Sequence, residues 1–242
     1  MAVPLHAQEA AEAGVTPYRP SVSSPAQLPL AGQLEFEVGG LSARADGGRR
    51  NSLPYTFKLA FNEQWGVLLG GEAYVAARDG NGQRERGIGD TSLVLKRAFL
   101  VDSSTAFGLE LGVKLPTAKD AIGSGKRDVT LNGIFSKDIG VFHLDANLNA
   151  TRLGAYDPGT GRTQAGMSAS VSTPVSEQWG LTAEVSDTHQ SGQAHATQLL
   201  LAAGYSPSKR LTFDFGVARG VHGDDRGWSL FSGVVLPLAR LW

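Results

Sequence analysis

The sequence contains no cysteine among its 242 residues, which excludes disulfide bridges and cysteine-ligated metal sites. Charge is also scarce: 22 Lys and Arg against 23 Asp and Glu make up 19% of the chain and leave a net charge of −1. Because no basic stripe is present to neutralise phosphates, nucleic acid is not an expected partner. No apolar run approaches the roughly 18 residues of a membrane helix, which excludes a helical membrane protein and leaves a membrane β-barrel open.

What the sequence does contain is strict alternation of polar and apolar residues, the pattern of β-strands. Between residues 142 and 150, even positions carry Phe, Leu or Ala, whereas odd positions carry His, Asp or Asn. We predict about twelve strands, each near or above the ~9–11 residues with which a tilted strand spans a bilayer. They cover residues 33–43, 52–62, 64–76, 87–101, 104–116, 128–138, 140–153, 162–174, 177–188, 195–206, 209–219 and 226–242.

The connections between these strands fall into two classes. Short links such as NEQ, VDSS and KDIG follow the even-numbered strands, whereas longer links rich in Gly and charge, such as ADGGRRN and RDGNGQRERG, follow the odd-numbered ones. Short turns at one rim, long loops at the other and an even strand count are typical of bacterial outer-membrane barrels. A soluble Greek-key sandwich has no reason to sort its loops in this way.

Aromatic residues support the same orientation, because they gather at the short-turn rim, as an interfacial girdle should. They are Phe61, Trp65, Phe99, Phe107, Phe135, Phe142, Trp179, Tyr205 and Trp242.

The two faces of the predicted strands differ in a way that favours lipid outside and water inside. The polar face carries only one or two charges per strand, in mid-span among small residues, whereas a soluble sandwich would cover it with Lys and Glu. In lipid every backbone group must be bonded internally, so the sheet must close. We therefore predict an all-β fold: a transmembrane antiparallel up-and-down β-barrel of about twelve strands in a bacterial outer membrane, with both termini in the periplasm.

Residues 1–32 differ from the rest because they are rich in Ala, Pro and Ser and show no periodicity. We predict an extended leader here and a barrel over residues 33–242. Within the leader, PLHAQEA is similar to the tail of an export signal around a small-residue cleavage site, although an ordinary polar leader fits equally well.

Two segments, GIGDTSLVLKRAF (87–99) and KLPTAKDAIGSGKRDVTLNGIFSKDIGVFHLDANLN (114–149), resemble the outer-membrane barrel family named for a phenol-degradation pathway. YRPSVSSPAQLPLAGQLEFEVG (18–39) is similar to the entry segment of that family. The resemblance implies a barrel that transports hydrophobic or aromatic compounds. The sequence departs from the family pattern at two points. A complete signal peptide is missing, and Pro237 and Arg240 interrupt the alternation of the last predicted strand. Trp242 resembles the C-terminal aromatic that such proteins present to the barrel-assembly machinery.

The candidate pore-lining residues are the ionisable side chains on the predicted lumen face. Asp90 and Lys96 share a parity, as do Glu110 and Lys114, and we expect lumen ion pairs that bridge neighbouring strands. A role in filling and rigidifying the barrel is favoured over direct substrate binding. The full set is Lys58, Glu72, Asp90, Lys96, Glu110, Lys114, His143, Asp145, Glu184 and Asp214.

No catalytic, cofactor-binding or metal-ligating residues are predicted. GIGD (87–90) lacks the third glycine and the following helix of a dinucleotide site, so its glycines are expected to make room for an interior side chain. His189, His195 and His222 fall in or near loops without metal-site spacing. A lipid-modifying enzyme needs a nucleophile and a base within hydrogen-bond reach, and no His on a lipid-facing parity has a Ser neighbour across a hairpin.

The long loops carry a surplus of basic residues. This surplus fits a solvated rim, and it also fits contact with lipopolysaccharide phosphates or attraction of anionic solutes. The basic residues are Arg44, Arg49, Arg50, Arg78, Arg84, Arg86, Lys119, Lys126 and Arg127.

The predicted function is an outer-membrane channel for passive uptake or efflux of small solutes, hydrophobic or aromatic compounds among them, through a charged and partly filled lumen. Roughly eight strands leave a lumen filled by side chains and 16–18 leave an open pore, so a twelve-stranded channel is expected to be narrow or closed at rest. A non-conducting structural or partner-binding barrel remains an alternative, with a lipid-modifying enzyme less favoured and a soluble sandwich least. The expected partners are outer-membrane lipid, lipopolysaccharide, a small solute and the assembly machinery.

Overall fold

The structure is a computed structural model that describes residues 14–45, 47–119, 121–223 and 226–242. The possible export-signal remnant at residues 4–10 lies outside these residues. Within them, no helix is long and apolar enough to cross a membrane. The strands are β1 (Gln33–Ala45), β2 (Gly48–Ala60), β3 (Trp65–Arg78), β4 (Arg84–Gly87), β5 (Thr91–Asp102), β6 (Thr105–Leu115), β7 (Asp128–Ile139), β8 (Phe142–Arg152), β9 (Thr163–Pro174), β10 (Trp179–Gln190), β11 (Ala196–Ser208), β12 (Leu211–His222) and β13 (Trp228–Arg240).

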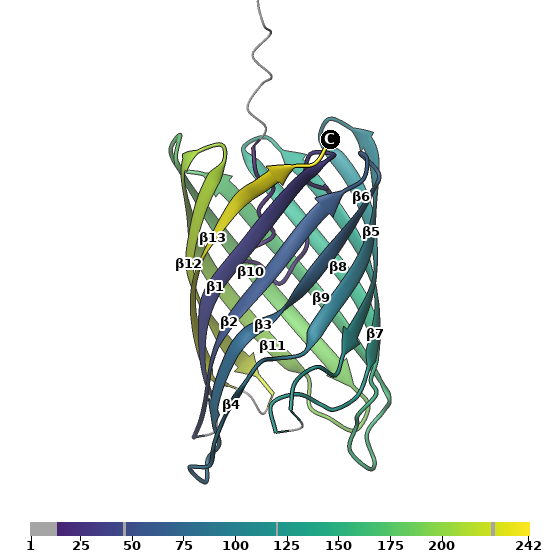
Figure 1. The fold of residues 1–242 in the computed structure, drawn as a ribbon, viewed down its shortest axis with the longest axis vertical. Coiled ribbons are helices and arrows are strands. Elements are labelled where there is room, and N and C mark those ends of the chain that lie inside the picture. The colour runs from purple at the N-terminus through teal and green to yellow at the C-terminus, as the bar shows by residue number, and fades with distance from the viewer. Residues whose placement is uncertain (1–13, 46, 120, 224–225) are drawn as a thin grey trace, which may run out of the picture.

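The strands form one closed antiparallel barrel (Figure 1). Each long strand pairs with the next along the chain, and β1 pairs with both β2 and β13, so the sheet has no free edge around the ring. The short β4 pairs only with β3 and extends the β3 hairpin beyond the long-loop rim. The twelve-stranded closed barrel predicted from alternation is confirmed, with β4 as an addition.

The largest differences from the predicted strand boundaries have reasons in local geometry. The expected loop ADGGRRN is a tight hairpin, because Gly47 adopts a positive φ of 75° and lets β1 and β2 continue to Ala45 and Gly48. The strand expected from residue 87 begins at Thr91, after a break that separates β4 from β5. In this break a Cβ on Gly89 would lie 2.7 Å from the Glu72 Cβ, so the glycine makes room for that inward side chain.

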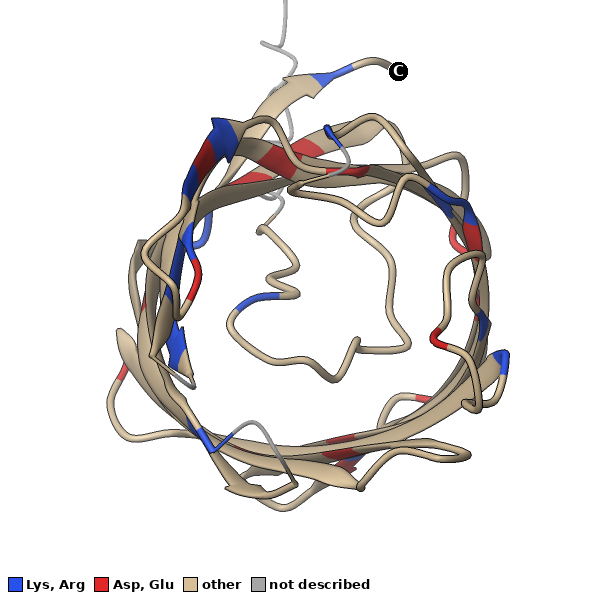
Figure 2. Cartoon of the chain, turned by 90° about the horizontal axis from the view of Figure 1, so that it is seen from below, with Lys and Arg blue, Asp and Glu red and all other residues tan. Residues whose placement is uncertain are grey.

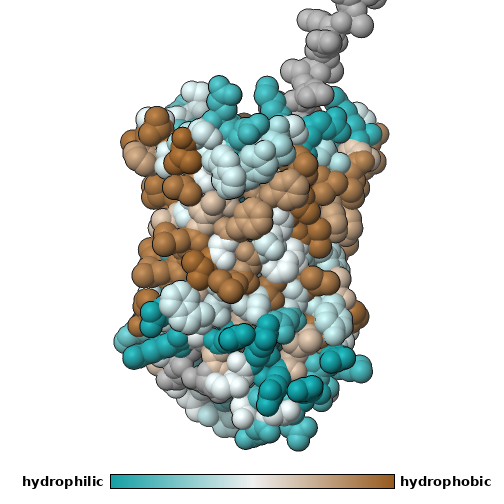
Figure 3. All heavy atoms as spheres, turned by 90° about the vertical axis from the view of Figure 1, so that its left-hand side faces the viewer, coloured by the Kyte–Doolittle hydropathy of each residue, from teal (hydrophilic) through white to brown (hydrophobic). Residues whose placement is uncertain are grey.

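The apolar side chains cover the outside of the barrel. On β6, Leu109 and Leu111 are 44% and 48% exposed, whereas Glu110 between them is only 8% exposed. Figure 3 shows the result as a hydrophobic band around the middle of the wall, with hydrophilic surface above and below it. A soluble protein would bury this face, so the exposure pattern is that of a barrel surrounded by lipid.

Aromatic rings lie at the short-turn rim, as predicted. Phe107 packs on Phe135 with ring centroids 5.3 Å apart, and Trp179 packs on Tyr205 at 4.9 Å. Phe61 beside the first short turn is 45% exposed. Rings at this level are suited to the boundary between hydrocarbon and water.

The register of the last strand, which the sequence left open, is set by a bulge. Glu35 pairs with Pro237, whereas Leu34 pairs with Ala239, so one extra residue of β13 is accommodated there. Pairing of β13 with β12 ends at Val235. Pro237 therefore lies where β13 has a single neighbour, the position at which a missing N–H is tolerated.

Leu111→Arg should destabilise the barrel by about 2–4 kcal/mol, because it places a charge in the middle of the lipid-facing wall. Ile139→Arg, at the short-turn end of β7, should cost only about 0–1 kcal/mol because the charge reaches the interface. Urea unfolding in lipid vesicles measures both free energies. Equal costs for the two variants would contradict the position of the apolar band.

Candidate functional site

A segment of the chain before β1 lies inside the barrel. Figure 2 shows this segment, residues 14–32, looping across the lumen within the ring of strands, and we call it the inner segment. Ser23 and Ala26 on it are almost completely buried, at 1% and 0% exposed. The extended leader predicted for this part of the chain is therefore an interior element, and the barrel is filled by its own N-terminal residues.

The inner segment is held by its backbone N–H groups, which donate to side chains of the barrel wall. Such bonding explains how a segment without secondary structure can be buried, since unpaired backbone groups are costly in an interior. The wall residues come from β1, β7, β8 and β10. The donors and acceptors are Thr16 to Glu35 at 3.1 Å, Tyr18 to Glu37 at 2.7 Å, Val22 and Ser23 to Glu184 at 3.0 and 2.7 Å, Ser24 to Asn147 at 3.0 Å, and Ala26 to Ser136 at 2.8 Å.

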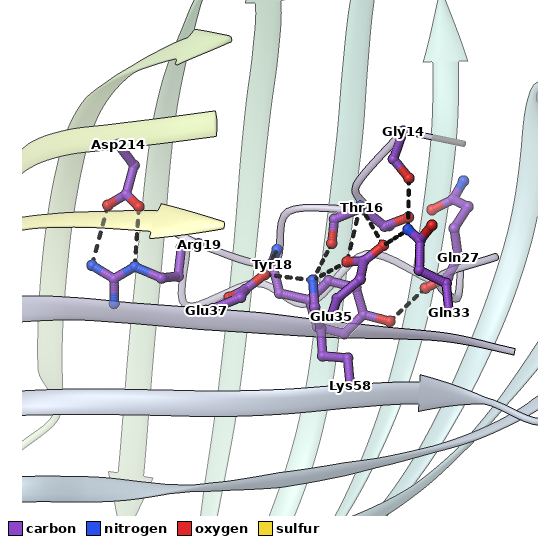
Figure 4. Close-up of polar contacts among 10 residues, drawn as sticks. All are labelled: Gly14, Thr16, Tyr18, Arg19, Gln27, Gln33, Glu35, Glu37, Lys58 and Asp214. Atoms are coloured by element: carbon purple, nitrogen blue, oxygen red, sulfur yellow. Dashed lines mark hydrogen bonds and ion pairs between the residues drawn. The ribbon is translucent and has the colours of Figure 1, made fainter. Parts of the chain in front are cut away.

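Lys58 is the centre of a buried ionic cluster (Figure 4). Its Nζ lies 2.9 Å from Glu35 Oε2 and 2.6 Å from Glu37 Oε1, and it also donates to the carbonyl of Thr16. The three ionisable side chains are 0–3% exposed. The Tyr18 ring covers the cluster, with its centroid 4.4 Å from Lys58 Nζ. The cluster thus ties the inner segment to β1 and β2.

Lys96 forms a second anchor on the adjoining wall. Its Nζ lies 2.9 Å from Glu110 Oε1 across the β5–β6 pair and donates to the carbonyl of Pro25. Tyr18 lies between the two lysines, because its ring centroid is 4.2 Å from Lys96 Nζ. Asn132 extends the network by donating to Glu110 at 3.0 Å.

Arg19 forms a third anchor at β12, which is separated from β1 only by β13. Its Nε and Nη2 each lie 3.1 Å from one of the two carboxylate oxygens of Asp214 on β12 (Figure 4). Asp214 is 1% exposed. A bidentate arginine–carboxylate pair fixes direction as well as distance, so the chain turn at Arg19 is held in one position.

The ionisable residues predicted to line the pore lie in separate groups along the lumen. Lys58, Lys96, Glu110, Glu184 and Asp214 surround the inner segment. Towards the long-loop rim, Lys114 lies 2.8 Å from Asp128 and 3.4 Å from Asp90, and Glu72 pairs with Arg50. Towards the short-turn rim, His143 contacts Asp138 and Asp145.

Each lysine pairs with a carboxylate contributed by the neighbouring part of the wall, and not with the acid that shares its own strand parity: Lys96 pairs with Glu110, and Lys114 pairs with Asp90. The ionisable side chains thus lie in separate groups, and the inner segment lies among them. Contact of solutes with these side chains stays a prediction.

Two cavities remain on the β8–β12 side of the lumen, one on each side of the inner segment. The larger, about 580 Å³, lies towards the short-turn rim and is lined by residues such as Asp145, Ser170 and Ser172. The smaller, about 260 Å³, lies towards the long-loop rim against Val22, which is 59% exposed. Since the wall here carries mainly small hydroxyl and Gly residues, this side is where the lumen is least filled.

Within the described part of the chain, no group of three or more His, Asp or Glu residues could hold a metal ion.

A closed barrel with an apolar outer band and a polar, partly filled lumen defines the class of outer-membrane β-barrels. The chain belongs to the family described as "Putative MetA-pathway of phenol degradation", whose model matches residues 18–238. No curated protein matches the sequence.

Solved structures of channels and porins share the fold. An outer membrane channel from Pseudomonas putida F1 is 14% identical, with a TM-score of 0.69 over 87% of this chain and 97% of that one. The KdgM porin in complex with disordered oligogalacturonate is 8% identical, with a TM-score of 0.59 over 84% and 99%. The CymD monoaromatic hydrocarbon channel is 8% identical, with a TM-score of 0.50 over 87% and 89%.

Proposed function

We propose that the protein is an outer-membrane channel for the passive passage of small solutes, hydrophobic or aromatic compounds among them. The observation that carries this is the pair of cavities on either side of the inner segment, along a wall of small polar residues. The similar folds of a porin and of a monoaromatic hydrocarbon channel support the same class of function. No energy coupling is needed, because a solute would move down its own gradient.

The path that we propose follows β8–β12. The opposite wall is blocked by the Lys58 and Lys96 anchors, whereas Ser170 and Ser172 on β9 line the larger cavity. A solute would pass between β9 and the inner segment, which requires the bonds of Ser23 to Ser168 and Glu184 to open. The charged groups at each end would screen solutes by charge before they reach the narrow section.

Ser172→Cys tests this path without background, because the chain has no native cysteine. Reaction of Ser172→Cys with a cationic methanethiosulfonate reagent should reduce ion conductance in planar bilayers at least by about half, since the adduct occupies a narrow lumen. Solute entry into proteoliposomes should fall in parallel.

Ser103→Cys is the matched control, because Ser103 is exposed in a short turn and does not line the cavity. The same reagent should leave its conductance unchanged. Full labelling of Ser172→Cys with undiminished conductance would contradict a path along β9.

A non-conducting structural barrel is the second candidate, and the density of anchors on the inner segment favours it. Six backbone N–H groups that donate to side chains of the wall, together with two lysines and one arginine, fix the segment. Absence of both conductance and solute flux in a correctly folded sample would decide for this candidate. A lipid-modifying enzyme is less supported, and turnover of phospholipid by the purified protein would reveal it.

Outside the barrel, we propose membrane lipid around the apolar band and the assembly machinery during biogenesis as partners. The side chain of Trp242 is exposed, so it is accessible to the second of these partners.

A further inference from the structure

A row of arginines crosses the barrel wall at the long-loop rim. Arg44 on β1 lies opposite Arg49 on β2, Arg49 opposite Arg78 on β3, and Arg78 opposite Arg84 on β4. Directly opposed residues of antiparallel strands point to the same face of the sheet. Four guanidinium-bearing side chains therefore stand side by side on strands spaced about 4.8 Å apart. We call these four residues the arginine row.

The arginine row faces away from the lumen. On β1, Arg44 has the parity of Phe36, which is opposite to that of the inward-facing Glu35 and Glu37. All four arginines of the row are exposed. Figure 1 shows the β3–β4 hairpin extending beyond the neighbouring strands at this rim, so the row continues past the end of the barrel wall.

The arginine row lies at the edge of the apolar band. Trp228 on β13 pairs with Arg44 and, on its other side, with Arg219, whose Cζ is 4.7 Å from the ring centroid. Closer to the middle of the wall, Leu53 and Leu230 are 45% and 62% exposed. Figure 3, which shows the side of the barrel at the left of Figure 1, has hydrophilic side chains directly under the hydrophobic band. Apolar wall and basic row are thus adjacent.

The charges of the arginine row are not balanced by neighbours on the same face. Like charges directly opposite one another destabilise a sheet. Among the residues that the structure describes, no ion pair includes a member of the row. The carboxylate of Asp79, next to Arg78, accepts hydrogen bonds from the backbone N–H groups of Asn81 and Gln83 at 3.0 and 2.8 Å. A bound polyanion would remove the repulsion.

We propose that the arginine row binds the phosphate groups of lipopolysaccharide in the outer leaflet. The planar guanidinium group of arginine can donate two parallel hydrogen bonds to the oxygens of one phosphate group. The long-loop rim of such barrels faces the outside, so the row meets the head groups of that leaflet. An amphiphile fits better than a free phosphate, because its acyl chains would lie on the apolar wall next to the row. This site is on the outer wall and does not depend on transport through the lumen.

The triple variant R44Q/R49Q/R78Q tests the proposal on the full chain in lipid nanodiscs. Titration with purified lipopolysaccharide, followed by native mass spectrometry, should show affinity reduced about tenfold or more, since several charge-assisted bonds are lost together. Lipopolysaccharide stripped of its phosphates should bind the wild-type chain as weakly as intact lipopolysaccharide binds the variant. Faster migration of unboiled than of boiled samples on gels checks that the barrel is folded.

K126Q/R127Q/R152Q is the matched control, because it removes three exposed positive charges from the same rim. Arg152 pairs with Val129 and Thr163, so these charges form no row. This variant should bind lipopolysaccharide like the wild type. Equal losses in the two triple variants, undiminished binding of dephosphorylated lipopolysaccharide, or inorganic phosphate binding as tightly as lipopolysaccharide would each overturn the proposal.

Discussion

Removing residues 15–27 should raise the unitary ion conductance of the reconstituted barrel several-fold. These residues include the whole portion of the inner segment that is bonded to the lumen wall from Thr16 to Ala26. A barrel of twelve strands is wide enough to leave an aqueous passage when its interior is not filled, because eight strands are filled by side chains alone. Single-channel recordings on the wild-type and shortened chains measure the change.

A disulfide engineered between the inner segment and the wall would show whether the segment must move for solutes to pass. Ser23 on the segment and Ser168 on β9 have hydroxyl oxygens 2.9 Å apart, which suits a disulfide between cysteines at these positions. If solutes pass only when the segment shifts, oxidised S23C/S168C should lose solute flux and regain it on reduction. Flux that is identical in the oxidised and reduced forms would mean that the solute path is static. Unchanged conductance in a folded, shortened chain would contradict occlusion by the segment altogether.

Lys58→Met should lower the free energy of unfolding by about 3–5 kcal/mol, because it leaves two buried carboxylates without a cation. Glu35 and Glu37 are 0% and 2% exposed and lie on either side of the Lys58 ammonium. The loss of stability is measured in two ways. One is the temperature at which samples heated in steps no longer show the folded form on a gel, and the other is urea unfolding in vesicles.

The triple variant K58M/E35Q/E37Q is the control for this effect. It removes all three charges while keeping amide oxygens that can accept from Thr16 and Tyr18. Much of the lost stability should return, because the cost arises from unpaired buried charge and not from the missing lysine side chain as such. A triple variant as unstable as Lys58→Met would show that the lysine's bond to the Thr16 carbonyl dominates.

The wall of the barrel could be predicted from the sequence because its strands alternate polar and apolar residues with a period of two. Alternation in segments such as 142–150 places Leu148 outside, at 69% exposed, and Asp145 inside, at 8%. Membrane surroundings leave few other solutions for such strands, since the backbone must bond to itself. The largest boundary errors lie where local chemistry overrides the period, at Gly47 and at Gly89.

The inner segment could not be predicted in the same way, because its position depends on contacts that are distant in sequence. Arg19 and Asp214 are 195 residues apart, and nothing in the order of residues near Arg19 indicates that partner. The signal that was present lay in the wall: Glu35 and Glu37 share the polar face of one strand, and no cation on that face of the strand can pair with them. Two such carboxylates require partners inside the lumen, and Lys58 with the backbone of Thr16 and Tyr18 supplies them.

The distribution of anchors around the lumen also constrains the order of events during folding. The inner segment leaves a ribosome before any strand, yet its partners include Lys58 on β2, Glu184 on β10 and Asp214 on β12. Contacts of such high sequence separation form late. The bonds from the inner segment to Glu184 and Asp214 therefore cannot form until β10 and β12 have joined the barrel, whereas its bonds to β1 and β2 involve strands that follow it closely in sequence.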